Sequence, residues 1–147
     1  MGPGALPTRA VGRLDFIDSP IAGRLAVFNG VDAYVQVDPP AKLGAGSGDF
    51  GVSLWVFAMD RKPSTLLARK GWSLAILDNG VLKFASDTGA LSAGSFTAGR
   101  WHQVLVSVRC DGQPSALFLD GEKAAEIVMP ASDLDAPGWP LMIGRTV

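Results

Sequence analysis

Two short apolar runs separated by Asp-Asn-Gly make up the stretch GWSLAILDNGVLKFA (71–85), the pattern of two antiparallel strands joined by a tight turn. Four further stretches have the same design, a β-branched or aromatic run next to Gly, Asn-Gly or Asp-Gly: FNGVDAYVQV (28–37), GDFGVSLWVFA (48–58), GRWHQVLVSV (99–108) and ALFLDGEKAAEI (116–127). No segment has a sustained helical period, and 18 Gly and 10 Pro would interrupt one. The sequence therefore predicts an all-β fold, an antiparallel sandwich.

The composition is that of one domain of 147 residues, with 48% apolar residues to fill a core. The net charge of −1 comes from 13 basic and 14 acidic residues without blocks, so nucleic acid and anionic membrane are not expected as partners. No apolar run approaches the roughly 20 residues of a membrane span, and MGPGALPTRA (1–10) lacks the apolar stretch of a secretory signal. We expect a soluble chain, either cytosolic or a piece of a longer protein, with residues 1–10 as a loose surface segment.

Two of the predicted strands differ in pattern. FGVSLWVFAM (50–59) is apolar at nearly every position, which predicts a central strand with both faces covered. WHQVLVSVR (101–109) alternates, with His102 and the valines on one face and Trp101, Gln103, Leu105, Ser107 and Arg109 on the other. The second face is available to line a groove, and the Gly- and Ser-rich loop 41–49 is expected to border a site.

Six short motifs follow one another in a fixed order within residues 25–145. They are Phe28-Asn29-Gly30 with Asp32 and Tyr34-Val35; Ser53 with Trp55-Val56; Leu82 after Asn79-Gly80; Gly99 with Trp101-His102 and Val104; Leu119-Asp120-Gly121; and Ile143-Gly144. On these motifs the chain resembles the laminin G-like jelly rolls of the concanavalin A-like lectin/glucanase superfamily. The resemblance implies two stacked antiparallel sheets, a fold that hosts carbohydrate-binding modules, protein-binding modules and some glycoside hydrolases.

The end of the chain departs from this family. Members continue after Ile-Gly with a closing strand that contains Gly, Ile-Asp and further apolar residues, whereas this sequence stops at Arg145-Thr146-Val147. Either an edge of the sandwich is open, or VGRLDFI (11–17), which echoes the closing motif, takes the vacant place. We favour the substitution as a hypothesis, because an unpaired edge beside a core strand is an aggregation hazard.

The inventory of reactive side chains argues against catalysis. Glucanases of the superfamily carry two Glu on one strand with an Asp between them, whereas here Glu122 and Glu126 have Ala124 in that place. They are interpreted as charges on an exposed strand. His102 is the only histidine and no Gly-x-Ser-x-Gly elbow is present. Cys110 cannot form an internal disulfide and is interpreted as an inert thiol.

Calcium is the one metal that the sequence leaves open, because related lectin-like domains hold Ca²⁺ at the rim of the sheet. The candidate ligands are Asp32 and Asp38. The alternative is that Asp32 only stabilises a turn, and this alternative is preferred because the chain has no dense acidic cluster beyond DLD at 133–135. No cofactor is required by any of the motifs.

Exposed tryptophans would indicate a sugar-binding surface. By resemblance to the family, Trp55 and Trp101 are expected in the core, whereas Trp72 and Trp139 are expected to be partly exposed. Each of these last two also fits a packing role at an end of the sandwich. The predicted ligand-binding residues are Arg69, Lys70, Trp72 and Gln103.

Three functions are consistent with the sequence. The first is a non-catalytic recognition module for carbohydrate, acting as an accessory domain of a larger protein. The second is a protein-docking or structural domain associated with a hydrolase, for which a broad apolar patch is expected in place of a polar groove. The third is a divergent glycoside hydrolase, which would need two carboxylates from different strands in one cleft.

Overall fold

The computed structural model describes residues 7–38, 48–94, 96–134 and 136–146. Within these ranges the chain forms strands and turns, and no helix is long and apolar enough to cross a membrane. Thirteen strands follow one another: β1 (Thr8–Val11), β2 (Asp15–Ser19), β3 (Gly23–Val27), β4 (Tyr34–Val37), β5 (Phe50–Phe57), β6 (Ser64–Arg69), β7 (Trp72–Ile76), β8 (Leu82–Ser86), β9 (Gly89–Ala93), β10 (Trp101–Val108), β11 (Pro114–Leu119), β12 (Glu122–Val128) and β13 (Leu141–Ile143). The predicted all-β class is confirmed.

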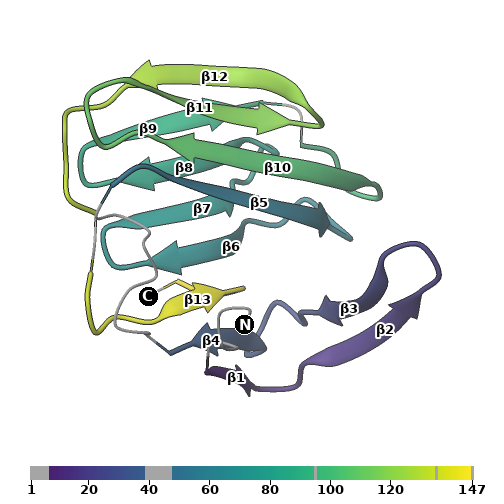
Figure 1. The fold of residues 1–147 in the computed structure, drawn as a ribbon. Helices are drawn as coiled ribbons and strands as arrows, with labels where there is room; N and C mark the ends of the chain where they lie inside the picture. The colour runs from purple at the N-terminus through teal and green to yellow at the C-terminus, as the bar shows by residue number, and fades with distance from the viewer. Residues whose placement is uncertain (1–6, 39–47, 95, 135, 147) are drawn as a thin grey trace.

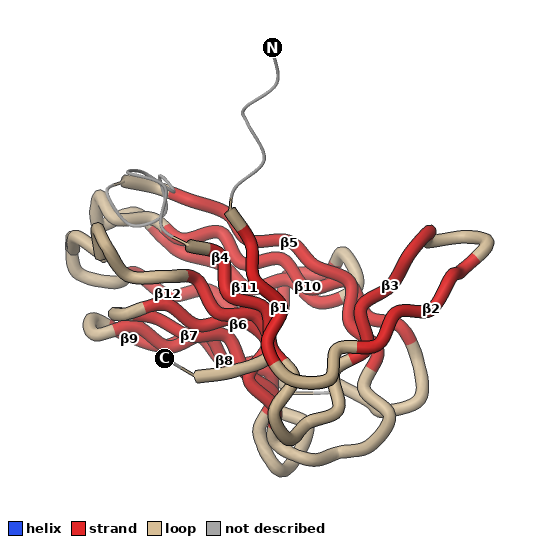
Figure 2. The backbone as a smooth tube through the Cα atoms, turned by 90° about the horizontal axis from the view of Figure 1, so that it is seen from below, coloured by secondary structure: helices blue, strands red, loops and turns tan. Residues whose placement is uncertain are grey.

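The strands form two stacked antiparallel sheets and one separate hairpin (Figure 1). The larger sheet has seven strands in the order β1-β4-β13-β6-β7-β8-β9, and the smaller has four in the order β12-β11-β10-β5. The third unit is the hairpin β2–β3, which projects from the body in both Figure 1 and Figure 2. This is the two-sheet sandwich that the sequence predicts.

The core lies between the two large sheets, where alternate side chains point inward. The most deeply buried members include Leu82 and Phe84 of the larger sheet and Val104, Val106 and Leu117 of the smaller one. The alternation predicted for residues 101–109 is confirmed, because His102 and the three valines face the core. Strands β7, β8 and β10 show the alternation of a pleated strand most clearly, with about every second residue in the core.

The prediction that residues 50–59 form a central strand covered on both faces is wrong. Among the described strands β5 pairs only with β10, so it is the edge of the four-stranded sheet. Its residues alternate between partly buried and exposed, with Trp55 exposed over 64% of its surface. Because Trp55 and Phe57 occupy outward positions, the nearly continuous apolar run gave the appearance of a strand buried on both faces.

Residues 11–17 do not form one substitute closing strand in this structure. Val11 ends β1, which pairs with β4, and Asp15 begins β2, which pairs with β3. Gly12 separates the two strands with a positive φ of 72°, and a Cβ at this position would collide with the backbone of Asp32. The chain therefore bends at Gly12, and the stretch cannot continue as one strand.

Two predicted loops have different outcomes. Residues 8–10 of the segment expected to be loose (1–10) belong to strand β1. Most of the Gly- and Ser-rich loop 41–49 lies outside the described residues.

Candidate functional site

Three of the four predicted ligand-binding residues come together at one end of the seven-stranded sheet. Arg69 ends β6, Lys70 lies in the turn, and Trp72 begins β7. Gln103 lies on β10 in the other sheet, opposite Trp55 of β5. The structure therefore separates Gln103 from the other three.

Arg69 fixes the loop that follows Leu134. Its side chain is only 3% exposed, and its Nη2 donates a hydrogen bond to the carbonyl of Ala136 at 3.0 Å. Its Nε donates a longer bond, 3.4 Å, to the carbonyl of Trp139. A buried cation that binds two backbone carbonyls of one loop holds that loop against β6. Arg69 therefore positions the loop, and too little of its surface is exposed for a broad contact with a ligand.

Trp72 belongs to the core, which contradicts its predicted partial exposure. It is buried between the rings of Phe50 and Phe84, at centroid distances of 5.5 and 5.9 Å. The sequence placed it at a strand start after two cationic residues, but the inward alternation of β7 carries its ring between the sheets.

Trp139 is the exposed tryptophan at this end, as predicted. Its ring is 42% exposed, and Lys70 Nζ lies 4.7 Å from the ring centroid in a cation–π contact. The backbone N–H of Trp139 donates to the carbonyl of Ala136 at 3.0 Å, which closes a turn. Together with the bonds from Arg69, this turn holds the ring in place beside a hollow.

Two adjoining hollows, of about 240 and 680 Å³, share Lys70, Gly71, Asp87 and Trp139, and we call them together the rim groove. The remaining lining residues are Ala68, Arg69, Trp72, Ser73, Ala85, Ser86, Asp133, Leu134, Ala136, Pro137 and Thr146. The lining thus combines the exposed ring of Trp139 and the buried Trp72 with hydroxyls, an ammonium, a guanidinium, two carboxylates and small residues. Such a groove can stack a flat apolar face on the ring and form hydrogen bonds around it.

A second surface is the outer face of the four-stranded sheet. Trp55, Phe57, Trp101 and Leu105 are exposed here, and we call them the aromatic face. The rings of Phe57 and Trp101 lie 5.6 Å apart between centroids. The expectation that Trp55 and Trp101 are core residues is wrong, since both occupy outward positions of β5 and β10. Gln103 shares this face and is half-buried among these side chains.

The two predicted calcium ligands take part in local hydrogen bonds. Asp32 Oδ1 accepts a bond from Asn29 Nδ2, and Asp38 Oδ1 accepts one from Gln36 Nε2, both at 2.6 Å. Asn29 Oδ1 also accepts bonds from the backbone N–H groups of Val31, Asp32 and Ala33. Within the described ranges, no three His, Cys, Asp or Glu residues gather as metal ligands. Calcium binding stays a prediction, and the role of Asp32 in a turn is the one that these contacts support.

His102 is a buried structural residue. Its Nδ1 lies 2.8 Å from Asp120 Oδ2, and its Nε2 lies 3.1 Å from Thr97 Oγ1. Asp120 Oδ1 also accepts the backbone N–H of Gln103 at 2.9 Å. Burial raises the pKa of the Asp120 carboxyl, but the bonds from Gln103, His102 and Arg100 outweigh it, and the net pKa is lowered. The pair joins the start of β10 to the end of β11.

The other residues considered for catalysis do not line the rim groove. Glu122 and Glu126 are exposed on the edge strand β12, where Glu126 forms a 2.8 Å ion pair with Lys123. Burial, with help from the nearby Asp49 carboxylate, raises the pKa of the Cys110 thiol. These positions agree with the interpretations of an exposed charged strand and an unactivated thiol.

Comparison with known proteins gives a consistent picture of the fold. The laminin G-like family profile described as Concanavalin A-like lectin/glucanases superfamily matches residues 29–147. Comparison with curated protein sequences found no match.

Three solved structures illustrate the likeness. Domain 4 of AbnA, a GH43 extracellular arabinanase from Geobacillus stearothermophilus in complex with arabinotriose, is similar with a TM-score of 0.73 and 17% identity, over 97% of this chain and 76% of that one. The carbohydrate-binding module CBM66 from Bacillus subtilis has a TM-score of 0.57 and 13% identity, over 96% and 89% of the two chains. The binding domain of botulinum neurotoxin DC in complex with SialylT has a TM-score of 0.68 and 14% identity, over 95% of this chain and 39% of that one. At these identities the likeness shows the fold, and the chain spans about two fifths of the neurotoxin domain.

Proposed function

Because the chain belongs to the concanavalin A-like lectin/glucanase superfamily, we propose that it is a non-catalytic carbohydrate-binding module whose sugar site is the rim groove. The observation that carries the proposal is Trp139, an exposed indole fixed beside hydrogen-bonding side chains by the buried Arg69. A ring that is already held in place loses little conformational entropy when a ligand stacks on it. Two proteins of similar fold are described with a carbohydrate, arabinotriose, or as a carbohydrate-binding module, which supports the same ligand class.

The charges of the rim groove favour a neutral sugar. One ammonium, Lys70, faces two carboxylates, Asp87 and Asp133, and Arg69 is occupied by the loop carbonyls. Carboxylates accept hydrogen bonds from sugar hydroxyls and repel an acidic sugar. In this proposal, Lys70 and Trp139 form the platform and Asp87 and Asp133 orient the hydroxyl groups. Of the predicted ligand-binding residues, Lys70 then contacts the sugar directly, whereas Arg69 holds the loop that carries Trp139.

The test is a glycan array on the wild-type protein and on two variants, Trp139→Ala and Trp101→Ala. Both rings are 42% exposed, but Trp101 lies on the aromatic face of the other sheet, so the pair is matched in exposure and differs in location. Loss of one stacked aromatic contact, about 1.5 kcal/mol, corresponds to roughly a tenfold weaker affinity. We expect Trp139→Ala to lose at least this much and Trp101→Ala to bind like the wild type.

The opposite result, with binding lost only in Trp101→Ala, would move the sugar site to the aromatic face. If no glycan binds the wild type, with Ca²⁺ or with EDTA, the carbohydrate proposal fails and the protein-docking function takes its place. Binding that EDTA abolishes would support a calcium site at Asp32 and Asp38.

A divergent glycoside hydrolase is kept as the second candidate because of one observation. Asp87 and Asp133 come from different parts of the chain and line the same 240 Å³ hollow. Two carboxylates across a sugar are the minimal apparatus for glycoside hydrolysis. Release of reducing sugar from a glycan that the array identifies, abolished in Asp87→Asn, would establish it, whereas an intact glycan after prolonged incubation would exclude it.

A further inference from the structure

The floor of the rim groove belongs to a row of residues that crosses four adjacent strands of the seven-stranded sheet, β6 to β9 (Figure 1). The register places these residues opposite one another: Ala68, Ser73, Ala85 and Ala90. Their neighbours along the strands, such as Leu74, pack in the core between the sheets. Because side chains alternate along a strand, the row faces outward from the sandwich.

Ala90 extends this row beyond the rim groove. Ala68, Ser73 and Ala85 line the larger hollow, whereas Ala90 does not. Ala90 is exposed and lies directly opposite Ala85, a position that puts the two Cα atoms about 5 Å apart. Among the described strands β9 is the last of this sheet, so the row leads from the groove to the edge of the sheet over a small side chain.

A large side chain stands at the opposite end of the row. Strand β13 lies beside β6, and its Met142 is opposite Ala68. Leu141 and Ile143 pack against the core, so Met142 between them points outward, yet it is only 7% exposed. A packed methionine next to an alanine forms a step in the surface. A chain molecule that lies on the row can therefore leave the groove over β9 and is blocked over β13.

Polar side chains flank the open part of the row. Lys83 and Ser92 are opposite each other on β8 and β9, two residues along each strand from Ala85 and Ala90, and so face the same side about 7 Å away. Asp87 of the β8–β9 turn lies on the other side and lines both hollows. Ammonium, hydroxyl and carboxylate groups all form hydrogen bonds with sugar hydroxyls. The surface beyond the groove can therefore bind further sugar units.

We propose that the rim groove takes one end of a linear neutral sugar chain, whose next units lie over Ala85 and Ala90 and leave the protein across β9. The inference rests on the proposed function, because Lys70 and Trp139 form the platform for the end unit. From Ala68 to Ala90 the row crosses three strand spacings, about 14 Å, so only the first few units of a chain contact the protein. The ligand is thus a chain end, and each end takes one protein molecule.

The test is isothermal titration calorimetry of the wild type with linear oligosaccharides of glucose, mannose, xylose and arabinose, each from a single sugar to a hexamer. In the series that binds, each of the first added units should tighten binding about two- to tenfold, the contribution of one hydrogen bond, and later units should add nothing. A long linear polymer of the same sugar should bind one protein molecule per chain.

Two results would overturn the chain end as ligand while the proposed function stands. One is a single sugar that binds as tightly as its hexamer. The other is a number of bound protein molecules that grows with polymer length, because it shows binding to the interior of the chain. Absence of binding to all four series also overturns the inference, and the glycan array then decides separately whether the proposed function fails.

The path across β9 is tested with Ala90→Leu, which raises the surface just outside the groove. This variant is expected to bind short and long oligomers with the same affinity. The matched control is Ala124→Leu, since Ala124 is also an exposed alanine but lies on β12 of the other sheet, and it should keep the length dependence of the wild type. Circular dichroism checks that both variants are folded. Full length dependence in Ala90→Leu would overturn this path.

Discussion

Replacing Arg69 with Met should lower the free energy of unfolding by about 3 kcal/mol. The guanidinium is buried and donates hydrogen bonds to the carbonyl of Ala136 at 3.0 Å and to the carbonyl of Trp139 at 3.4 Å. A hydrogen bond made by a charged group contributes about 1.5–3 kcal/mol, and the longer bond belongs at or below the lower limit. Methionine fills a similar volume but cannot donate, so the loop carbonyls lose these partners. For a domain of this size, about 3 kcal/mol corresponds to a fall in Tm of about 6–12 °C.

The assay is thermal unfolding followed by circular dichroism, with intrinsic tryptophan fluorescence to report on the environment of Trp139. The matched control is Arg109→Met. Arg109 forms ion pairs of 2.8 Å with Asp49 and 2.7 Å with Asp111, but these side chains are 40–47% exposed to water. Exposed pairs are screened by water and salt, so the control should have nearly the Tm of the wild type. Equal losses in the two variants, or no loss in Arg69→Met, would refute the idea that Arg69 anchors the loop.

Three further outcomes are expected. Leu82→Ala should cost about 2–5 kcal/mol in urea denaturation because Leu82 is fully buried, whereas Trp55→Ala should change stability little because Trp55 lies on the outer face. Gly12 and Gly23 both have a φ of 72°, a conformation that costs an alanine about 1–2 kcal/mol. Of the two, only Gly12→Ala would also push its Cβ into the backbone of Asp32, so Gly12→Ala should lower the Tm clearly more than Gly23→Ala. The lowered pKa of Asp120 means that its carboxylate stabilises the fold above pH 3.8, and this stabilisation is lost as the pH falls through the lower pKa of the folded state. Asp120→Asn removes this titration, so the free energy of unfolding should depend less on pH in the acidic range.

The sequence predicted the strands and their alternation better than it predicted which strands pair with each other. The alternation of residues 101–109 correctly separated His102 from Gln103, because the period of a strand is a local property. The same period in residues 50–57 was hidden by apolar residues on both faces, and the edge position of β5 depends on pairing with β10, about 50 residues further along the chain. Trp55 was expected in the core from the resemblance to the family, although it is exposed on the outer face of β5.

The ligand-binding residues expected from the sequence stay a prediction, and the structure changes what two of them can do. Three of them lie at the turn after β6, but Arg69 binds loop carbonyls and Trp72 lies in the core. Asp87 and Asp133 were not predicted as site residues, because they reach the rim groove from segments distant from Lys70 in the sequence. Trp139 between Gly138 and Pro140 was the one local signal, since a large ring in a turn-rich segment has few neighbours to bury it.

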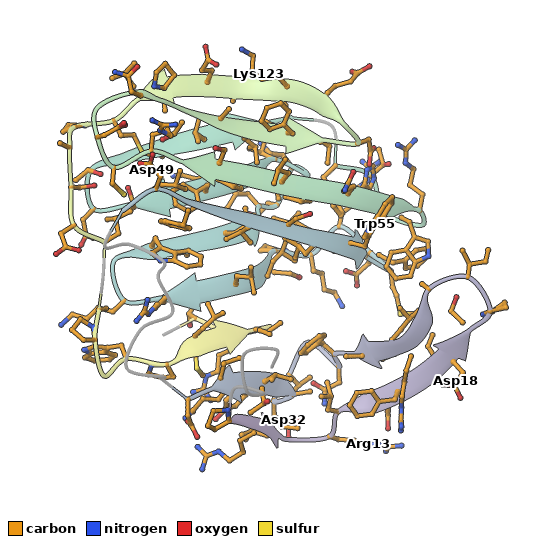
Figure 3. All side chains as sticks on the ribbon, in the orientation of Figure 1. Arg13, Asp18, Asp32, Asp49, Trp55 and Lys123 are labelled. Carbon is orange, nitrogen blue, oxygen red and sulfur yellow. The ribbon has the colours of Figure 1, made fainter. Side chains whose placement is uncertain are left out.

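The two exposed aromatic surfaces lie at different places on the sandwich. In Figure 1 the turn between β6 and β7 lies at the left end, whereas Figure 3 places Trp55 toward the right-hand end of β5. Trp101 pairs with Phe57 at that same end of β5. A substitution on the aromatic face is therefore remote from the rim groove, so a loss of sugar binding in Trp139→Ala that is absent in Trp101→Ala can be assigned to the rim groove itself.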